Sequence, residues 1–467
     1  MPTSVRSLRQ PGASSVNRGI LRAALSVSAA AVVVKVAATA KEIAVAGVYG
    51  RSDAMDAFLA AALVPGLLVN LISESMNQAL VPTLIRVREL EGRERAQQLL
   101  SNAMFWMCLL LACVSAAMAL GARAFFPLIA SHFGAAKMTL SIRLFYGLLP
   151  VVLITGIAIN CTAVLNAQGR FMLPALAPIA ISAATIAGVM TLGGRLGMWA
   201  MVWATLAGTA VQAVLLVWMM QAQGYRFRLR WYGMDEPTRE VGHQYGPVLL
   251  SSMVASGGLL VDQAMAAMLA AGSVSALVYA NRFVSVVLAL SAGAVSTAIV
   301  PSLSRLIAHG DWSGCRHTLR LWTGLTALVS IPLAALLVFG AHGLVRAAFQ
   351  HGAFGCGDTA VVARVLAMYA LQIPFFVTSR VFYRFLVAMR RSDLVLYCGT
   401  LNLALDVVLN LVLMRWLGVA GIALATSLWT VSTFFFLGYW ARRLLGEAEA
   451  AAAGSASRAR RVLRSKT

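Results

Sequence analysis

Two stretches of the sequence match each other: residues 79–86 read ALVPTLIR, and residues 298–305 read AIVPSLSR. Two further pairs of stretches match in the same chain order and at a nearly constant offset. These are YGLLP at 146–150 with YALQIP at 369–374, and Leu196-Gly197 with Leu417-Gly418. Apolar composition inflates chance similarity, but three ordered matches predict two copies of one fold.

The composition places both copies in a membrane. Of 467 residues, 60% are apolar and only 12% are charged, and the mean hydropathy is +0.79. Soluble proteins carry about 25% charged residues, so a soluble enzyme is excluded, and long apolar runs exclude the short alternating strands of a β-barrel. We therefore predict an all-α, polytopic membrane protein. About twelve spans are expected, near residues 20–47, 54–82, 97–121, 138–167, 171–193, 197–221, 241–270, 274–303, 318–340, 359–388, 394–414 and 418–441.

The repeat divides these spans into two lobes of six. Since six is even, both lobes enter the membrane in the same orientation, which is a parallel repeat typical of alternating-access transporters, with a cleft between the lobes. The predicted organisation is an N-terminal tail (1–19), an N-lobe (20–221), a linker (222–240), a C-lobe (241–441) and a basic, disordered tail (442–467).

The charge distribution predicts the orientation. The formal net charge is +21, from 38 Lys and Arg against 17 Asp and Glu. With the N-terminus inside, 24 basic residues lie on inner segments and six on outer ones, so the positive-inside rule places both termini and the linker in the cytoplasm. This explains most of the excess charge by orientation and by contact with membrane lipids, and we expect no nucleic-acid partner. The six outer residues are Arg51, Arg123, Lys137, Arg195, Arg346 and Arg415.

Ionisable residues inside the spans indicate function, because each costs free energy unless it faces a cavity or a partner. Positive charge dominates: Lys35 and Lys41 lie in the first span and Arg282 in the eighth, one set from each lobe. A cationic cleft suits an anionic substrate such as a phosphate-linked lipid. Snorkelling or paired side chains are the alternative. The other ionisable residues at depth are Glu42, Asp56, Glu74, Arg143, Asp262, Arg364, Arg380, Arg384 and Asp406.

Several motifs together resemble the MurJ/MviN lipid II flippases of the multidrug/oligosaccharidyl-lipid/polysaccharide exporter superfamily, over about residues 30–440. They are SDAMDAF (52–58), PGLL (65–68), NQALVP (77–82), LNAQGRF (165–171), PALAP (174–178), GSVS (272–275), YANRF (279–283), PSLSR (301–305) and LGVAGIALATS (417–427).

The resemblance implies a flippase that carries an undecaprenyl-pyrophosphate-linked saccharide to the outer leaflet. It implies substrate-binding roles for five residues: Lys35, Lys41, Asp56, Glu74 and Arg282. Three features depart from the family. Lys35 stands where Arg is usual, Val69-Asn70 replaces a pair of Arg, and no apolar run for two further helices follows residue 441. An ammonium keeps the charge but loses the guanidinium fork that suits pyrophosphate.

The resemblance also implies a sodium site in the C-lobe, with ligands at Asp262, Asn402, Asp406 and Thr426. A spacing of four residues places Asn402 and Asp406 on one helix face, and oxygen atoms suit a small alkali cation. A buried polar cluster that bridges helices is the alternative. No other cofactor is expected, and a proton could serve as the coupling ion instead.

Three functional classes compete. A flippase for lipid II is the leading hypothesis, with an exopolysaccharide or O-antigen repeat-unit flippase as its nearest alternative. A multidrug or cation antiporter needs an acidic or aromatic pocket, whereas the charges here are mainly positive. A membrane-embedded transferase needs an acid-base group beside a metal, and the six His are scattered without ligand spacing, so we expect no enzyme. The sequence leaves the sugar and the oligomeric state open.

Overall fold

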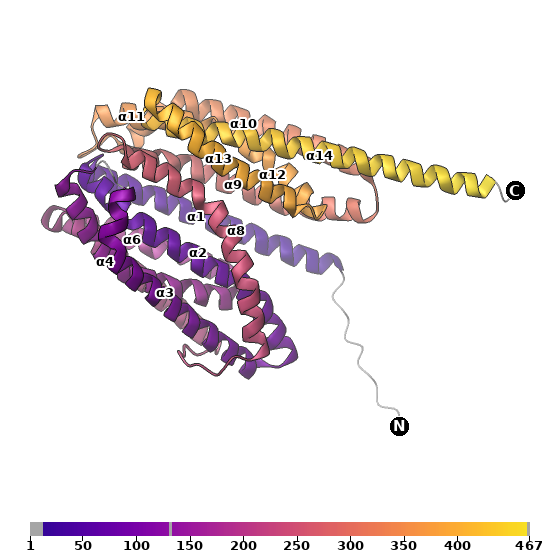
Figure 1. The fold of residues 1–467 in the computed structure, drawn as a ribbon, viewed down its shortest axis with the longest axis horizontal. Coiled ribbons are helices and arrows are strands. Elements are labelled where there is room, and N and C mark those ends of the chain that lie inside the picture. Colours follow the sequence, from indigo (N-terminus) through magenta and orange to yellow (C-terminus); the bar gives the residue numbers. More distant parts are fainter. Residues whose placement is uncertain (1–12, 130–132, 465–467) are drawn as a thin grey trace.

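Every regular element of the computed structural model is a helix, within the residues that it describes (Figure 1). These are 13–129 and 133–464, with side chains outside 13–28, 128–129, 254–255, 292–298, 300–302 and 453–464. The helices are α1 (Ala13–Tyr49), α2 (Asp53–Leu90), α3 (Arg93–Ile129), α4 (Ala135–Ala167), α5 (Met172–Leu176), α6 (Ile179–Leu196), α7 (Met198–Ala222), α8 (Glu236–Ala267), α9 (Ser273–Ala308), α10 (Trp312–Phe349), α11 (Cys356–Ala370), α12 (Ile373–Ala388), α13 (Ser392–Leu417) and α14 (Val419–Arg464).

Eleven spans in the described residues are long and apolar enough to cross a membrane. They correspond to predicted spans two to twelve, and two of them are broken: α5 and α6 form one span, and so do α11 and α12. The first predicted span is α1, which is 37 residues long. Its described side chains include three charges, on Lys35, Lys41 and Glu42. The predicted all-α membrane architecture is confirmed.

The two copies of the repeat share a distinctive turn. Gly197, between α6 and α7, has φ 54° and ψ −135°, and Gly418, between α13 and α14, has φ 57° and ψ −135°. A positive φ favours glycine because a Cβ atom would be strained there. The same backbone conformation at matched positions supports the repeat that the sequence predicted. In the matching stretch AIVPSLSR (298–305), the side chains of residues 298 and 300–302 lie outside the described ones.

The helices form two groups, with α1 and α8 between them (Figure 1). In the first group α2, α3, α4, α6 and α7 pack on one another; in the second, α9 to α14 do so. Helix α1 contacts α6 and α9, and α8 contacts α2 and α13, so each touches both groups. The beginning of α1 and the end of α14 lie on the same side of the molecule (Figure 1).

The apolar cores show where the two groups are joined. One core contains residues of both groups, from Val45 and Phe145 to Tyr279 and Phe349. A second core, built around α2, α3 and α4, also includes Val241 of α8 but, among the described residues, none of α9 to α14; its members Leu84 and Leu100 lie near the ends of α2 and α3 on the side where α14 ends. The groups are therefore packed together at the end away from the termini.

The C-terminal region differs from the predicted disordered tail. Helix α14 continues past residue 442 to Arg464. Arg443 pairs with Glu447 one turn later, and Arg316 of α10 forms an ion pair with Glu449. These pairs, with an alanine-rich stretch of high helix propensity, explain the continuation and correct the prediction. Of the predicted N-terminal tail, residues 1–12 lie outside the described residues, and α1 begins within it at Ala13.

Candidate functional site

A cluster of charged side chains joins α1 to α9. The buried carboxylate of Glu42 accepts hydrogen bonds from Nε (3.2 Å) and Nη2 (2.9 Å) of Arg282, and it lies 3.0 Å from Nζ of Lys41. Lys35, less than two turns earlier on α1, is close enough to Arg282 for their charges to interact. The structure therefore brings the three predicted cations together, and it adds Glu42 as the shared partner of Lys41 and Arg282.

The burial of Glu42 explains why it needs both partners. Its exposed fraction is 2%, and a buried carboxylate is costly unless cations and hydrogen bonds compensate for the lost hydration. The cations keep more contact with solvent, since the side chains of Lys41 and Arg282 are 20% and 31% exposed. Within the described residues Lys35 has no acidic partner, so three positive charges face one negative charge. The cluster retains a net positive charge that an anion could neutralise.

Asp56 is placed at the junction of the two groups. It lies in the first turn of α2, buried, and its Oδ2 and Oδ1 atoms accept hydrogen bonds from the backbone N–H of Gly272 (2.7 Å) and Ser275 (2.9 Å). It thus caps the N-terminus of α9, where a negative charge is favourable. Nζ of Lys137 lies 3.4 Å from the same carboxylate. In this conformation, Asp56 holds α9 against α2.

Three further polar contacts surround Asp56 and also connect the two groups. Nε of Arg51 donates to Asp358 at 3.1 Å, the Tyr279 hydroxyl donates to the carbonyl of Gly50 at 3.0 Å, and the Ala353 N–H donates to the carbonyl of Gly47 at 2.8 Å. We call these contacts, together with those of Asp56, the outer seal, after the outward orientation that the charge distribution predicts for this end of the molecule. They lie at the end of the molecule where the apolar core is shared, and they must break if the lobes separate there.

The outer seal gives a stability prediction. Asp56→Ala leaves two buried N–H groups without acceptors, and we expect the free energy of unfolding to fall by about 2 kcal/mol. Asp53→Ala is the matched control, because exposed Asp53 also accepts from Lys137 (2.7 Å) but caps no part of α9. Thermal unfolding of the purified variants should show a clear loss for Asp56→Ala and almost none for Asp53→Ala; equal losses would contradict the capping role.

The remaining predicted substrate residue, Glu74, lies on α2 and is exposed. It has no hydrogen bond or ion pair within the described part of the chain. The adjacent Ser75 is buried, and its hydroxyl lies 3.2 Å from that of Ser252 on α8. The structure therefore leaves Glu74 accessible beside the contact between α2 and α8.

Three helices meet in a second polar cluster, at the predicted cation site. Oδ1 of Asp262 accepts from Nδ2 of Asn410 (2.8 Å) and its Oδ2 from the hydroxyl of Thr426 (3.2 Å). The same Asn410 amide donates to Oδ1 of Asp406 (3.2 Å). The Asn402 side chain has a different partner: its Nδ2 donates to the Thr433 hydroxyl at 2.9 Å. The structure thus unites α8, α13 and α14 through three of the four predicted residues.

Asn410 was missed by the sequence analysis. It follows Asp406 by four residues and so extends the same helix face, which is the signal that could have found it. It is fully buried and joins the two carboxylates through a single amide group.

The donor set of this cluster fits a small cation. Three of its buried side-chain oxygens have no hydrogen-bond partner among the described residues: Oδ2 of Asp406, Oδ1 of Asn410 and Oδ1 of Asn402. A buried polar atom without a partner is costly, and two carboxylates that share one amide repel each other. Carboxylate and amide oxygens are ligands of hard cations. A sodium ion or a proton here would relieve both costs, with Asp262, Asp406 and Thr426 as the first residues to hold it.

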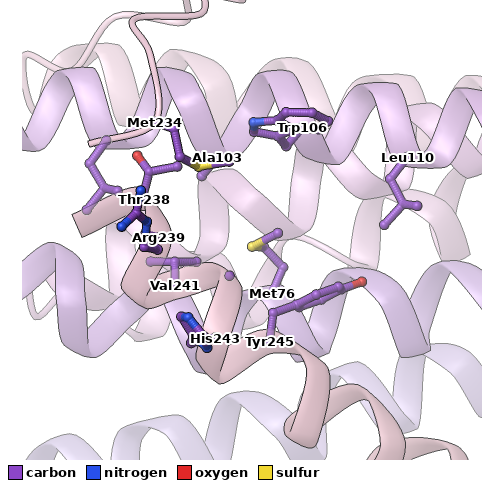
Figure 2. Close-up of a pocket in the computed structure, with 12 residues that line it drawn as sticks. Met76, Ala103, Trp106, Leu110, Met234, Thr238, Arg239, Val241, His243 and Tyr245 are labelled. Atoms are coloured by element: carbon purple, nitrogen blue, oxygen red, sulfur yellow. The ribbon is translucent and has the colours of Figure 1, made fainter. Parts of the chain in front are cut away.

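A separate cavity of about 650 Å³ lies between α2, α3 and the first turns of α8 (Figure 2). Its wall is largely apolar, with Met76, Trp106 and Leu110 around it and Arg239 and His243 at one end. No predicted substrate or cation residue lines it. It is therefore distinct from both polar clusters.

Comparison with known proteins gives one family. Residues 45–459 match the family model of the lipid II flippase MurJ. The lipid II flippase MurJ of Burkholderia cenocepacia is 28% identical over 374 residues, which are 76% of this chain and 70% of that relative. A probable lipid II flippase MurJ of Synechocystis sp. is 26% identical over 449 residues, 92% of this chain and 83% of that relative.

Solved structures show the same fold. A lipid II flippase MurJ in the inward closed conformation gives a TM-score of 0.78 at 20% identity, covering 89% of this chain and 87% of that one. An inward-facing multidrug resistance transporter of the MATE family gives 0.76 at 12% identity, covering 89% and 95%. Because the family model covers most of the sequence, the chain belongs to the family of lipid II flippases named MurJ.

Proposed function

We propose that this protein carries lipid II, an undecaprenyl-pyrophosphate-linked saccharide, from the inner to the outer leaflet of the bacterial cytoplasmic membrane. It acts as a transporter by alternating access and has no enzymatic role. The observation that carries the proposal is the cluster of Lys35, Lys41, Glu42 and Arg282, which retains net positive charge where α1 of one lobe meets α9 of the other. Such a cluster can bind the pyrophosphate between the lobes.

We propose that the two lobes are the parts that move relative to each other during transport. Residues 20–221 form the N-lobe and 241–441 the C-lobe, and the linker 222–240 connects them. The outer seal holds them together at one end, so the described conformation corresponds to the inward-facing half of the cycle. Release to the outer leaflet requires that Asp56 leave Gly272 and Ser275. Asp56 therefore contributes to the substrate path through the opening and closing of the lobes, and exposed Glu74 on α2 is available to bind the substrate directly.

A cation in the second polar cluster biases the equilibrium between the conformations of the transporter. We propose sodium at Asp262, Asp406 and Thr426, with Asn402 joining them after a change of partner. The ion ties α8, α13 and α14 together in one arrangement, and an ion that binds one conformation better than the other shifts the equilibrium between them. It acts at a distance from the cationic cluster, which lies on α1 and α9.

Complementation tests the substrate. Cells depleted of their own lipid II flippase should regain growth when they express this chain, whereas cells that lack an O-antigen flippase should not regain O-antigen. Rescue of O-antigen alone would assign the protein to the repeat-unit flippases. A multidrug antiporter would instead raise drug resistance and leave both strains unrescued.

The orientation can be tested with a native cysteine. All six cysteines are free, and Cys356 is exposed at the start of α11, on the outer side in the proposed topology. We expect a membrane-impermeant maleimide added to intact cells to label the protein, and Cys356→Ser to abolish the labelling. In that background, Leu229→Cys in the linker, an exposed position, should be labelled only after the cells are opened. Labelling of residue 229 in intact cells would reverse the topology.

A further inference from the structure

Two adjoining cavities lie at the end of the C-lobe that is near the chain termini. The first, about 650 Å³, is lined by α10, α12 and α14, including Arg316, Arg320, Phe382 and Arg442. The second, about 400 Å³, is lined by α10 alone, including Leu321, Leu325 and Leu328. Arg320 and Gly324 line both cavities, so the two adjoin at these residues.

The first cavity carries uncompensated positive charge. Arg316 forms an ion pair with Glu449, but Arg320 and Arg442 have no ion pair in the described part of the chain. Of the side chains that the structure describes, no acidic one lines the cavity. Arginine side chains that converge on one space favour a phosphate, which they can bind with two parallel hydrogen bonds. The chemistry of this cavity therefore fits the anionic head of a ligand.

The second cavity suits an apolar chain. Leu321, Leu325 and Leu328 follow one another at helical spacing on the outside of α10, and they are 50%, 43% and 69% exposed. They lie further from the start of α10 than Arg316 and Arg320, and hence deeper in the membrane. Gly324 leaves the passage between the cavities open, because a Cβ atom there would meet no atom within 4 Å.

We propose that these two cavities form a binding site for an anionic phospholipid of the inner leaflet. Its phosphate lies against Arg320 and Arg442, and one acyl chain follows Leu321, Leu325 and Leu328 past Gly324. Basic pockets between transmembrane helices on the cytoplasmic side are suited to anionic lipid heads. The described residues that line the site lie on α10, α12 and α14, away from the α1–α9 cluster. The site is therefore distinct from the transport path and needs no relative movement of the lobes.

Photolabelling of the full chain tests this proposal. The protein is placed in phosphatidylcholine nanodiscs with a phosphatidylglycerol that carries a diazirine in its acyl chain, and the labelled peptides are mapped by mass spectrometry. We expect labelling within residues 316–328 to fall at least fivefold in Arg320→Gln/Arg442→Gln and in Gly324→Phe. Two matched controls should stay within twofold of the unmodified protein: Arg443→Gln, which changes the neighbouring charge, and Gly340→Phe, which also enters open space on α10.

Other outcomes would overturn the proposal. Unchanged labelling in both pocket variants, or equal labelling by a photoreactive phosphatidylcholine, would show that the head group is not recognised. Competition by inorganic phosphate would assign the arginines to a free anion. Competition by a polyprenyl diphosphate but not by unlabelled phosphatidylglycerol would assign the cavities to the transported substrate. Because none of these readouts requires transport, they are independent of the flippase proposal.

Discussion

Arg282→Ala is expected to abolish the rescue of flippase-depleted cells while the protein remains inserted in the membrane. Arg282 comes from α9 and faces the cations of α1, so its loss removes the C-lobe contribution to anion binding. The same change deprives buried Glu42 of one of two cationic partners, and breaking a buried ion pair is destabilising. Thermal unfolding of the purified variant should therefore show a moderate loss of stability beside the complete loss of transport.

The double variant Glu42→Gln/Arg282→Gln separates these two effects. It removes both charges of the pair, so no buried carboxylate is left without its cationic partner. The stability should therefore recover toward that of the unmodified protein. Transport should remain absent, because the positive charge of Arg282 is still missing. Lys35→Arg preserves the charge and should be tolerated. Growth rescue by the double variant would mean that Arg282 serves only to neutralise Glu42.

Sodium should stabilise the purified protein against thermal unfolding, and Asp406→Asn should remove most of that stabilisation. A ligand that binds only the folded state contributes about 2.7 kcal/mol at a hundred times its dissociation constant. Asp406 offers a buried oxygen without a partner, and its negative charge attracts the ion. Potassium at the same ionic strength is the control for nonspecific effects.

Substitutions at two further positions show how the site assembles. If Asn402 changes partner to bind sodium, Asn402→Ala should weaken the sodium response, whereas Thr433→Val, which removes only its present partner, should preserve or strengthen it. Asp262→Asn should act like Asp406→Asn. An unchanged sodium response in both aspartate variants would eliminate the site.

The sequence predicted the architecture well because its signals are local. Long apolar runs locate the helices, and the glycines at 197 and 418 adopt the same backbone conformation at equivalent turns of the two lobes. The tail after residue 442 was misjudged for a physical reason. Its composition indicated disorder, but the ion pair between Arg316 and Glu449 depends on how α10 lies beside α14.

For the candidate sites, the sequence predicted which residues take part better than it predicted which residues they contact. Charges at depth identified Lys35, Lys41 and Arg282, yet the sharing of Glu42 between α1 and α9 depends on contacts 240 residues apart in the chain. Asp56 is a similar case. Nothing in its local sequence indicates that it caps a helix in the other lobe, at residues 272 and 275. Long-range contacts of this kind follow from the tertiary packing.

The most direct test of the central claim is lipid flipping by the purified protein in vesicles. A lipid II analogue with a fluorescent group on its head is placed in both leaflets, and dithionite, which does not cross the membrane, is added outside. We expect the fluorescence to fall well below the half that empty vesicles retain, and vesicles with Glu42→Gln/Arg282→Gln to behave like empty ones. Retention of half the fluorescence by vesicles with the unmodified protein, or full flipping by the double variant, would contradict it.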